Sequence, residues 1–273
     1  MHLRNNHDPE VRRFAEFQLD LGSGNNLAAD GTLNLPEDLT LHGSTLTPLI
    51  NHIYPDLHSN PPPAPSSFIN HMILAPRNDD VHVLNHNMID SFQASPANTK
   101  VYCSADSAII QDELSDDIPV SKLTLKVGCP VIHLCNLSTC DGLCNGTRAI
   151  IAVLKDRVVG IKKIHDGQVA EDVTWIPHLT LEPSEQGEFH FTLRRRQLPL
   201  ALAFSMTINK SQGQSVNVVG IDLRVPCFSH GQLYVACSQA RSRQGLKILL
   251  PEGDVQTTSN VVWQDALLHP RGM

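Results

Sequence analysis

The apolar periodicity of this chain changes between residues 122 and 181, and this change constrains the fold more than any other feature. Within the stretch, short runs such as Leu123–Val127 alternate apolar and polar residues with a period of two. Asn145-Gly146 and Asp166-Gly167 separate some of these runs, and such pairs are typical of β-hairpin turns. The stretch therefore predicts a small unit of short antiparallel strands.

The sequence on either side of this stretch has the pattern of a parallel α/β fold. Phe68–Ala75 is an apolar run bounded by Pro76, and Asp79–Phe92 carries apolar residues at helical spacing. Ala203–Gln214 also starts with apolar residues and ends in a polar turn, after which we expect a helix. The predicted fold class is therefore α/β, with the small β unit inserted into a parallel-sheet domain.

Residues 231–241 predict a further helix with one apolar face. The residues at helical spacing on that face are Leu233, Ala236, Cys237 and Ala240. The polar residues Gln232, Gln239 and Arg243 are expected to point away from that face.

The amino-terminal segment predicts helices followed by a linker. Asp8-Pro9-Glu10 has the composition of a helix start, and Gly22 and Gly24 end the helical pattern that follows. Residues 48–54 predict a second, short helix. The four prolines of residues 60–67 exclude a helix or a central strand there. We therefore expect a helical segment with its linker at 1–67, the α/β domain at 68–115 and 186–273, and the inserted β unit at 116–185.

The charge balance does not indicate a nucleic-acid partner by itself. The formal net charge is −7, so any contact with a polyanion must come from a local basic group. Candidates are Arg194-Arg195-Arg196, Lys210, and Lys122 with Lys126, each of which could equally be a solvated basic face. No apolar run approaches the roughly 18 residues that a membrane span needs, and we expect no membrane partner.

The seven cysteines are expected to be reduced thiols, because the count is odd and the amino terminus is polar. Cys135, Cys140 and Cys144 lie close together in the sequence, with His133 nearby. Zinc sites usually contain tight cysteine pairs in duplicate, and no second pair occurs here. We therefore expect no metal site.

The polar turn Thr207–Gln214 has the composition of an anion-binding site. Lys210 supplies a positive charge, Ser211 a hydroxyl, and Gly213 would allow a phosphate to approach the backbone closely. The turn that follows Phe68–Ala75 is a second candidate, since parallel α/β folds bind ligands at the carboxyl ends of their strands. Asn78 in that turn could face a ligand, or it could simply cap the next helix.

Thr207–Gln214 and Tyr234–Arg241 resemble the last two signature motifs of the Pif (petite integration frequency) family of superfamily-one DNA helicases, in the branch carried by Helitron transposons. Nearly the whole chain is covered, because further stretches also resemble the family. These are Ile73–Val81, Leu123–Val131, Gly142–Arg148, Val219–Leu223, Pro226–Gly231 and Gly245–Ile248.

The resemblance implies the carboxyl-terminal half of an ATP-dependent 5′-to-3′ DNA helicase. It implies a RecA-like motor domain whose insert is a 2B domain, an SH3-like β-barrel. The implied partner is single-stranded DNA, and the implied cofactors of the full-length family are ATP and Mg²⁺. We also expect a nuclear location, although no targeting signal is visible, and the pathway (transposition, repair or telomere maintenance) stays open.

The resemblance also implies residue roles. Single-stranded DNA would be contacted by Asn78, Arg148, Thr207, Asn209, Lys210 and Ser211. The nucleotide would be contacted by Gly213, Gln214 and Arg241.

Two features that the family needs for ATP hydrolysis are absent from these residues. No Gly-Lys-Ser or Gly-Lys-Thr occurs, so the phosphate loop and, by implication, the first motor domain are missing. Gln239 stands at the position of the arginine finger, and His2 at that of an arginine near the γ-phosphate. Since arginine fingers contribute roughly 10³ to 10⁵ in rate, we expect no ATP turnover by this chain alone. The alternatives are a non-catalytic single-strand-binding module and a decayed transposon fragment.

Overall fold

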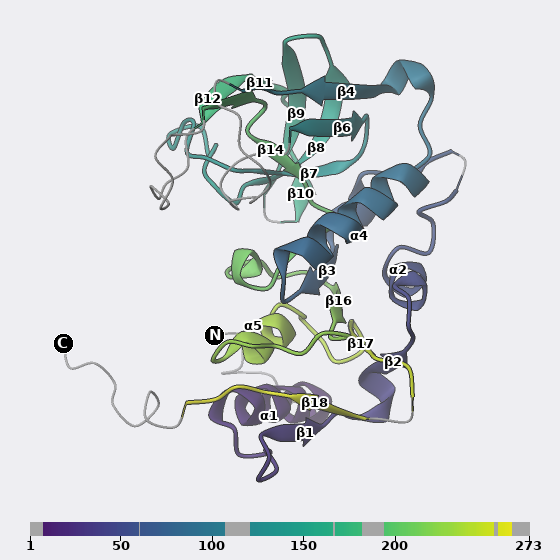
Figure 1. Ribbon diagram of the computed structural model, residues 1–273, viewed down its shortest axis with the longest axis vertical. Helices are drawn as coiled ribbons and strands as arrows, with labels where there is room; N and C mark the ends of the chain where they lie inside the picture. The colour runs from purple at the N-terminus through teal and green to yellow at the C-terminus, as the bar shows by residue number, and fades with distance from the viewer. Residues whose placement is uncertain are drawn as a thin grey trace, which may run out of the picture. The chain divides into compact units, whose positions relative to one another are not determined.

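The computed structural model describes residues 8–59, 61–106, 121–165, 167–181, 194–253 and 256–263, and every structural statement below concerns these ranges. The chain divides into two compact units, whose elements are labelled in Figure 1. The first unit comprises Met1–Pro55, Asn70–His82 and Ser205–Met273. The second comprises Asp56–Ile69 and Val83–Phe204.

The first unit is built on a sheet of five parallel strands. In spatial order they are β15 (Ser205–Thr207), β3 (His71–Ala75), β16 (Val218–Asp222), β17 (Leu246–Leu250) and β2 (Thr40–His42). Leu74, Ile221 and Ile248 in the three central strands are fully buried, as expected where both faces of a parallel sheet are covered. The α/β class with a parallel sheet is therefore confirmed.

Helices and short elements surround this sheet. The helices are α1 (Pro9–Ser23), α2 (Thr47–Ile53), α5 (Gln232–Ser238) and the first turns of α4 (Asn78–Ser91). The short elements are the 3₁₀ turns η1 (Glu37–Leu39) and η3 (Asn209–Ser211), and the antiparallel pair β1 (Thr32–Asn34) and β18 (Thr257–Ser259). Figure 1 shows α2 and α5 on opposite sides of β16.

The amino-terminal helix begins and ends where its sequence predicts. The carboxylate of Asp8 accepts a hydrogen bond from the N–H of Glu10 at 2.9 Å, and Pro9 occupies the first turn. Gly24 ends the helix with a φ of 72°, a left-handed conformation that glycine adopts without steric cost. The predicted amino-terminal helical segment is thus confirmed.

The second unit is an antiparallel β structure. Its main sheet contains β7 (Pro130–His133), β8 (Arg148–Leu154), β9 (Val158–His165), β10 (Gln168–Val169), β11 (Thr174–Pro177) and β14 (Leu200–Leu202). Smaller sheets contain β5 (Ala105–Asp106), β12 (Leu179–Leu181) and β13 (Arg195–Gln197), and the pair β4 (Thr99–Cys103) and β6 (Lys122–Lys126). The other elements are α3 (Ser66–Ile69), η2 (Pro96–Asn98) and the later turns of α4. The predicted antiparallel strands are present, and an SH3-like barrel stays a prediction.

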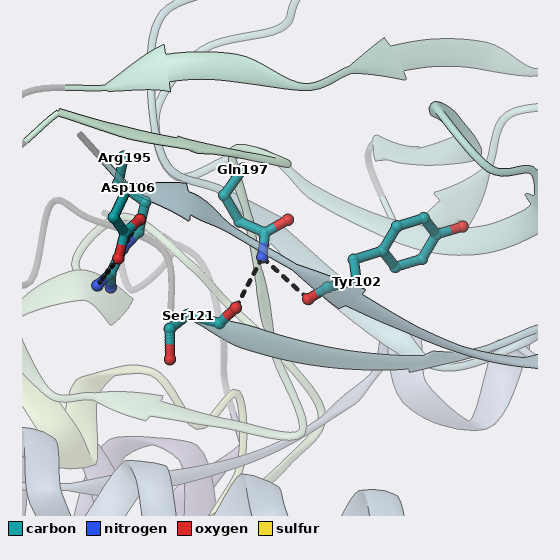
Figure 2. A network of polar contacts seen from close by, with 5 residues as sticks. All are labelled: Tyr102, Asp106, Ser121, Arg195 and Gln197. Atoms are coloured by element: carbon teal, nitrogen blue, oxygen red, sulfur yellow. Dashed lines mark hydrogen bonds and ion pairs between the residues drawn. The ribbon is translucent and has the colours of Figure 1, made fainter.

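A buried polar network joins three parts of the second unit that lie far apart in the sequence (Figure 2). The side-chain amide of Gln197 donates to the carbonyl oxygens of Tyr102 at 3.0 Å and Ser121 at 3.3 Å, and its own oxygen accepts from the N–H of Leu198. Beside it, Arg195 forms a two-point ion pair with Asp106. One residue of the predicted basic patch is therefore neutralised within its own sheet.

Lys126 is also used internally. Its ammonium group donates to the carbonyl oxygens of Ile89 at 2.6 Å and Phe92 at 2.8 Å, where α4 ends. A cation at the carboxyl end of a helix satisfies carbonyls that lack partners within the helix. Lys126 therefore stabilises α4 and does not belong to a free basic patch.

The division into units differs from the predicted domain boundaries. β4 lies before the predicted insert and pairs with β6, while β14 lies after it and pairs with β7. The described residues 83–106 and 194–204 therefore group with the β unit, because long-range strand pairing holds them there, and the domain boundaries stay a prediction. The predicted strand at 68–75 is likewise shortened to β3, since Ser66–Ile69 forms α3.

Candidate functional site

Two polar turns lie side by side at the carboxyl edge of the parallel sheet. β15 and β3 are neighbours, with Thr207 opposite Ala75, and the N–H of Ile208 donates to the carbonyl oxygen of Ala75 at 3.1 Å. The chain then continues into η3 from β15 and into α4 from β3. The pairing therefore brings the Asn209-Lys210 turn next to the Arg77-Asn78 turn, as the predicted position of a ligand requires.

The polar side chains at this edge come from the two turns. Asn209 and Arg77 are exposed, and Lys210 and Asn78 are half-buried. They include two cations and two amides, which are suitable partners for phosphate oxygens. Arg77 precedes Asn78 directly, and no role was predicted for it. Its position just after the apolar run Phe68–Ala75 could have identified it as a candidate ligand contact.

Other residues predicted to contact DNA are internal. Thr207 is 7% exposed and Ser211 is fully buried, and the Ser211 hydroxyl donates to the carbonyl oxygen of Ile208 at 2.7 Å. This hydrogen bond closes the η3 turn and occupies the donor that a phosphate would need. The Ser211 side chain therefore shapes the turn, which corrects its predicted role as a DNA contact.

Arg148 is buried in the second unit. Its guanidinium donates to the carbonyl oxygens of Phe68 at 2.7 Å and Ile69 at 3.2 Å, and the residue is only 4% exposed. A guanidinium engaged in this way cannot also reach a DNA phosphate at the surface. The predicted DNA contact at Arg148 is therefore wrong in this structure, and the side chain instead fixes the end of α3.

No helix follows the polar turn, in contrast to the prediction. After η3 the chain passes through Gly213, whose φ of 85° lies in the left-handed region, and reaches Val216. Val216 forms a parallel bridge with Ala240, so pairing with a distant segment takes the place of the helix. A Cβ at Gly213 would meet no atom within 4 Å, and glycine is therefore favoured here by its backbone conformation.

The bridge between Val216 and Ala240 brings the predicted nucleotide-binding residues close together. The N–H of Val216 donates to the carbonyl oxygen of Gln239 at 3.1 Å, and the N–H of Arg241 donates to that of Val216 at 3.2 Å. The Gly213-Gln214 turn and the exposed Arg241 are thus held close by the backbone. The Arg241 guanidinium lies 3.4 Å from the side-chain oxygen of Asn217.

Gln239 does not face a ligand. It is 5% exposed, and its amide donates to the carbonyl oxygen of Val235 at 2.7 Å and to the Ser238 hydroxyl at 3.1 Å. The residue at the predicted arginine-finger position therefore caps the end of α5. His2, the other predicted position of this kind, lies outside the described residues.

The predicted helix is shorter than residues 231–241, but its apolar residues are buried: Leu233, Ala236 and Cys237 lie in α5, and Ala240 lies just beyond its end. The three polar residues differ in their surroundings. Gln232 and Gln239 are also buried, while Arg243 forms a two-point ion pair with Asp38. Gln232 is bonded to backbone groups of two loops, and Gln239 to the carbonyl oxygen of Val235 in its own helix. These bonds allow the amides to be buried, and helical spacing alone does not reveal them.

A charged cluster lies at the end of β16. Asp222 is 3% exposed and accepts two side-chain hydrogen bonds from Arg224, each 2.9 Å long. Burial raises the pKa of the Asp80 carboxyl above its ordinary value, and the nearby Asp222 charge acts in the same direction. Arg224 is thus paired with Asp222 at this edge, while Lys210 and Arg77 lie in the two polar turns.

Neither a metal site nor a membrane span is found in the described part of the chain. No three His, Cys, Asp or Glu side chains there are grouped closely enough to hold an ion. The Nδ1 atom of His133 lies 2.6 Å from the carbonyl oxygen of Cys135, so this histidine donates to the backbone. No described helix combines the length and apolar character needed to cross a bilayer.

Sequence comparisons relate the chain to known helicases. Residues 115–154 match the family model described as the 2B domain of DNA helicase Pif1. The ATP-dependent DNA helicases PIF1 of Mus musculus and Homo sapiens are each 35% identical to the chain over 179 residues, which is 64% of this chain and 26% of each relative. The PIF1 protein of Saccharomyces cerevisiae (strain YJM789) is 56% identical over 55 residues. The chain thus spans about a quarter of the length of the vertebrate relatives it matches.

Solved structures agree on the fold. The Pif1 helicase of Candida albicans aligns with a TM-score of 0.56 and 24% identity, over 87% of this chain and 53% of that one. A Bacteroides Pif1 helicase in complex with ADP-AlF3 and single-stranded DNA aligns with a TM-score of 0.54 and 20% identity, over 96% of this chain and 53% of that one. The arrangement of elements described above is therefore shared with these helicases.

Proposed function

Because the chain is related to the Pif1-type DNA helicases over part of their length, we propose that it is a carboxyl-terminal motor portion of such an enzyme. In this proposal it binds single-stranded DNA and supplies one side of an ATP site with its Mg²⁺. The 5′-to-3′ polarity and the Helitron branch are part of the proposal. A nuclear location is also proposed, which imaging of the tagged chain would test.

The observation that carries this proposal is the pair of polar turns at the carboxyl edge of the parallel sheet. Thr207 opposite Ala75 places Lys210 and Asn209 beside Arg77 and Asn78. Cations and amides from adjacent strands can hold a phosphodiester backbone without reading its sequence. Because the net charge is −7, this local cluster, and not the bulk charge, would account for the affinity.

Replacing Lys210 with alanine is expected to weaken binding to single-stranded DNA. Loss of one phosphate contact should lower affinity roughly fivefold at low salt and reduce the salt slope of log K by about 0.7. Fluorescence anisotropy of a labelled oligothymidylate across a salt series would measure both. The control is Arg13→Ala, which removes an equal charge from the exposed face of α1. Equal losses in the two variants would show that only overall charge matters and would refute the site.

ATP turnover by this chain alone is expected to stay at background, with or without single-stranded DNA. The 273 residues contain no phosphate loop, and Gln239 is buried and uncharged where the family has an arginine. A phosphate-release assay with saturating oligothymidylate and Mg²⁺ would test this. DNA-stimulated turnover well above that of a buffer blank would contradict the proposal.

The inward orientation of Gln239 favours one alternative, a non-catalytic single-strand-binding module. Such a module and the helicase portion would both bind DNA, so binding does not separate them. The genomic sequence upstream of Met1 would separate the two candidates. An in-frame phosphate loop there would favour the full helicase, whereas stop codons would favour the module or a decayed transposon fragment.

A further inference from the structure

Gln232 is a buried amide that belongs to no apolar face. It is the first residue of α5 and is 2% exposed. Transferring an amide from water to a protein interior is unfavourable unless its hydrogen-bonding groups find partners. The partners of Gln232 therefore show which parts of the first unit the residue joins.

The amide of Gln232 connects two loops that leave neighbouring strands. Its side-chain oxygen accepts from the N–H of Phe228 at 3.1 Å and from that of Ser229 at 3.4 Å, both in the loop after β16. Its side-chain nitrogen donates to the carbonyl oxygen of Pro76 at 3.5 Å, a long hydrogen bond, in the turn after β3. Because β3 and β16 are paired in the sheet, the Gln232 side chain can contact both the turn after β3 and the loop after β16.

The hydrogen bond to Pro76 has a particular consequence for the chain direction. The proline ring fixes φ of Pro76, so ψ is the remaining soft dihedral, and the direction of the carbonyl group depends on it. Holding that carbonyl therefore sets the path by which the chain enters Arg77 and Asn78. These are the residues that border the Asn209-Lys210 turn.

The geometry points to Gln232 as the positioning residue of the Arg77-Asn78 turn. It would act through the Pro76 carbonyl and would not touch DNA itself. Its effect on DNA rests on the proposed function, whereas its effect on the turn does not. Two variants separate its contacts. Gln232→Met removes all three hydrogen bonds, and Gln232→Glu keeps an acceptor for Phe228 and Ser229 but loses the donor to Pro76.

The first readout is independent of DNA. Trypsin cleaves after arginine, so the cleavage rate after Arg77 reports how often the turn opens. Both variants are expected to raise this rate about fivefold, while cleavage after Arg13 on α1, in the same unit, stays within about twofold. Digestion would be followed by mass spectrometry well below the melting transition of each variant. Unchanged cleavage at Arg77, or an equal rise at both arginines, would overturn the positioning role.

A matched control separates positioning from general loss of packing. Gln18 on α1 is half-buried and donates through its side-chain amide to the carbonyl oxygen of Cys237 at 2.9 Å, so it is also a glutamine bound to α5. Gln18→Met should lower the melting temperature, as Gln232→Met does, without selective cleavage after Arg77. Selective cleavage in both variants would mean that any loosening of α5 frees the turn, and this would contradict the proposal.

The second readout is the affinity for single-stranded DNA. Gln232→Met should weaken binding about fivefold, because the Arg77-Asn78 turn is no longer held where it can contact phosphate. In the Asn78→Ala background the same change should have little further effect, since residues that act through one another are not additive. Additive losses would contradict the role of Gln232 in DNA binding. Absence of DNA binding by the unaltered chain would instead refute the proposed function, and the cleavage result would still decide whether Gln232 holds the turn.

Discussion

Replacing Arg148 with alanine is expected to lower the free energy of unfolding by about 4 kcal/mol, while the folded variant keeps its affinity for single-stranded DNA. The guanidinium is buried and donates to the carbonyl oxygens of Phe68 and Ile69. Truncation leaves a cavity and removes charged donors from both carbonyls, and each effect is destabilising. Part of the loss is offset because a buried cation no longer has to be desolvated.

Denaturant unfolding and anisotropy on the same preparations would test this prediction. Arg196→Ala is the control, because Arg196 is an exposed arginine of β13 in the same unit. It should change stability by no more than about 0.5 kcal/mol. If Arg148→Ala does not fold, Arg148→Lys keeps one charged donor and should show an intermediate loss. A stable Arg148→Ala variant that binds DNA tenfold more weakly would restore the role predicted from sequence.

Local signals predicted the parts of the fold that are locally determined. Asp8, Pro9 and Gly24 define α1 because capping depends on neighbouring residues. The period of two between residues 122 and 181 predicted antiparallel strands because hairpin partners are close in sequence. For the same reason the turns after β3 and β15 could be recognised as candidate ligand contacts from their composition.

Features set by distant partners could not be predicted in this way. Val216 pairs with Ala240, and this bridge replaces the helix expected after Lys210. Arg148 looks like a phosphate contact in the sequence, but its acceptors at Phe68 and Ile69 lie 80 and 79 residues away. Gln232 likewise owes its burial to Pro76, 156 residues away. In each case a hydrogen bond to a residue distant in the sequence decides the local structure or the role of the side chain.

The candidate site combines features that the sequence predicted with features that it did not. Asn209 is exposed and Lys210 is half-buried, whereas Ser211 in the same turn is fully buried. A turn of three residues directs neighbouring side chains differently, and the sequence does not say which of them closes it. Residues that bind and residues that support are therefore mixed within one motif.

Replacing Gly245 with alanine is expected to destabilise the first unit by about 3 kcal/mol or more. A Cβ at this position would lie 1.8 Å from the carbonyl oxygen of Asn217, far inside van der Waals contact. Neither backbone segment can move aside easily. The carbonyl oxygen of Gly245 accepts from the N–H of Val219 at 2.7 Å, and the N–H of Asn217 donates to Asn70.

The strain should also spread to the candidate nucleotide side of the site, because the Asn217 side chain contacts Arg241. Thermal unfolding would measure the effect, with Gly43→Ala as the matched control. A Cβ at Gly43 would lie no closer than 3.4 Å to any neighbouring atom, an ordinary contact, so that variant should stay within about 1 kcal/mol of the parent. If Gly245→Ala were as stable as Gly43→Ala, Gly245, the residue before β17, could not lie as close to the carbonyl oxygen of Asn217 as described here. The presence of glycine at position 245 would then not be explained by a clash between a Cβ and Asn217.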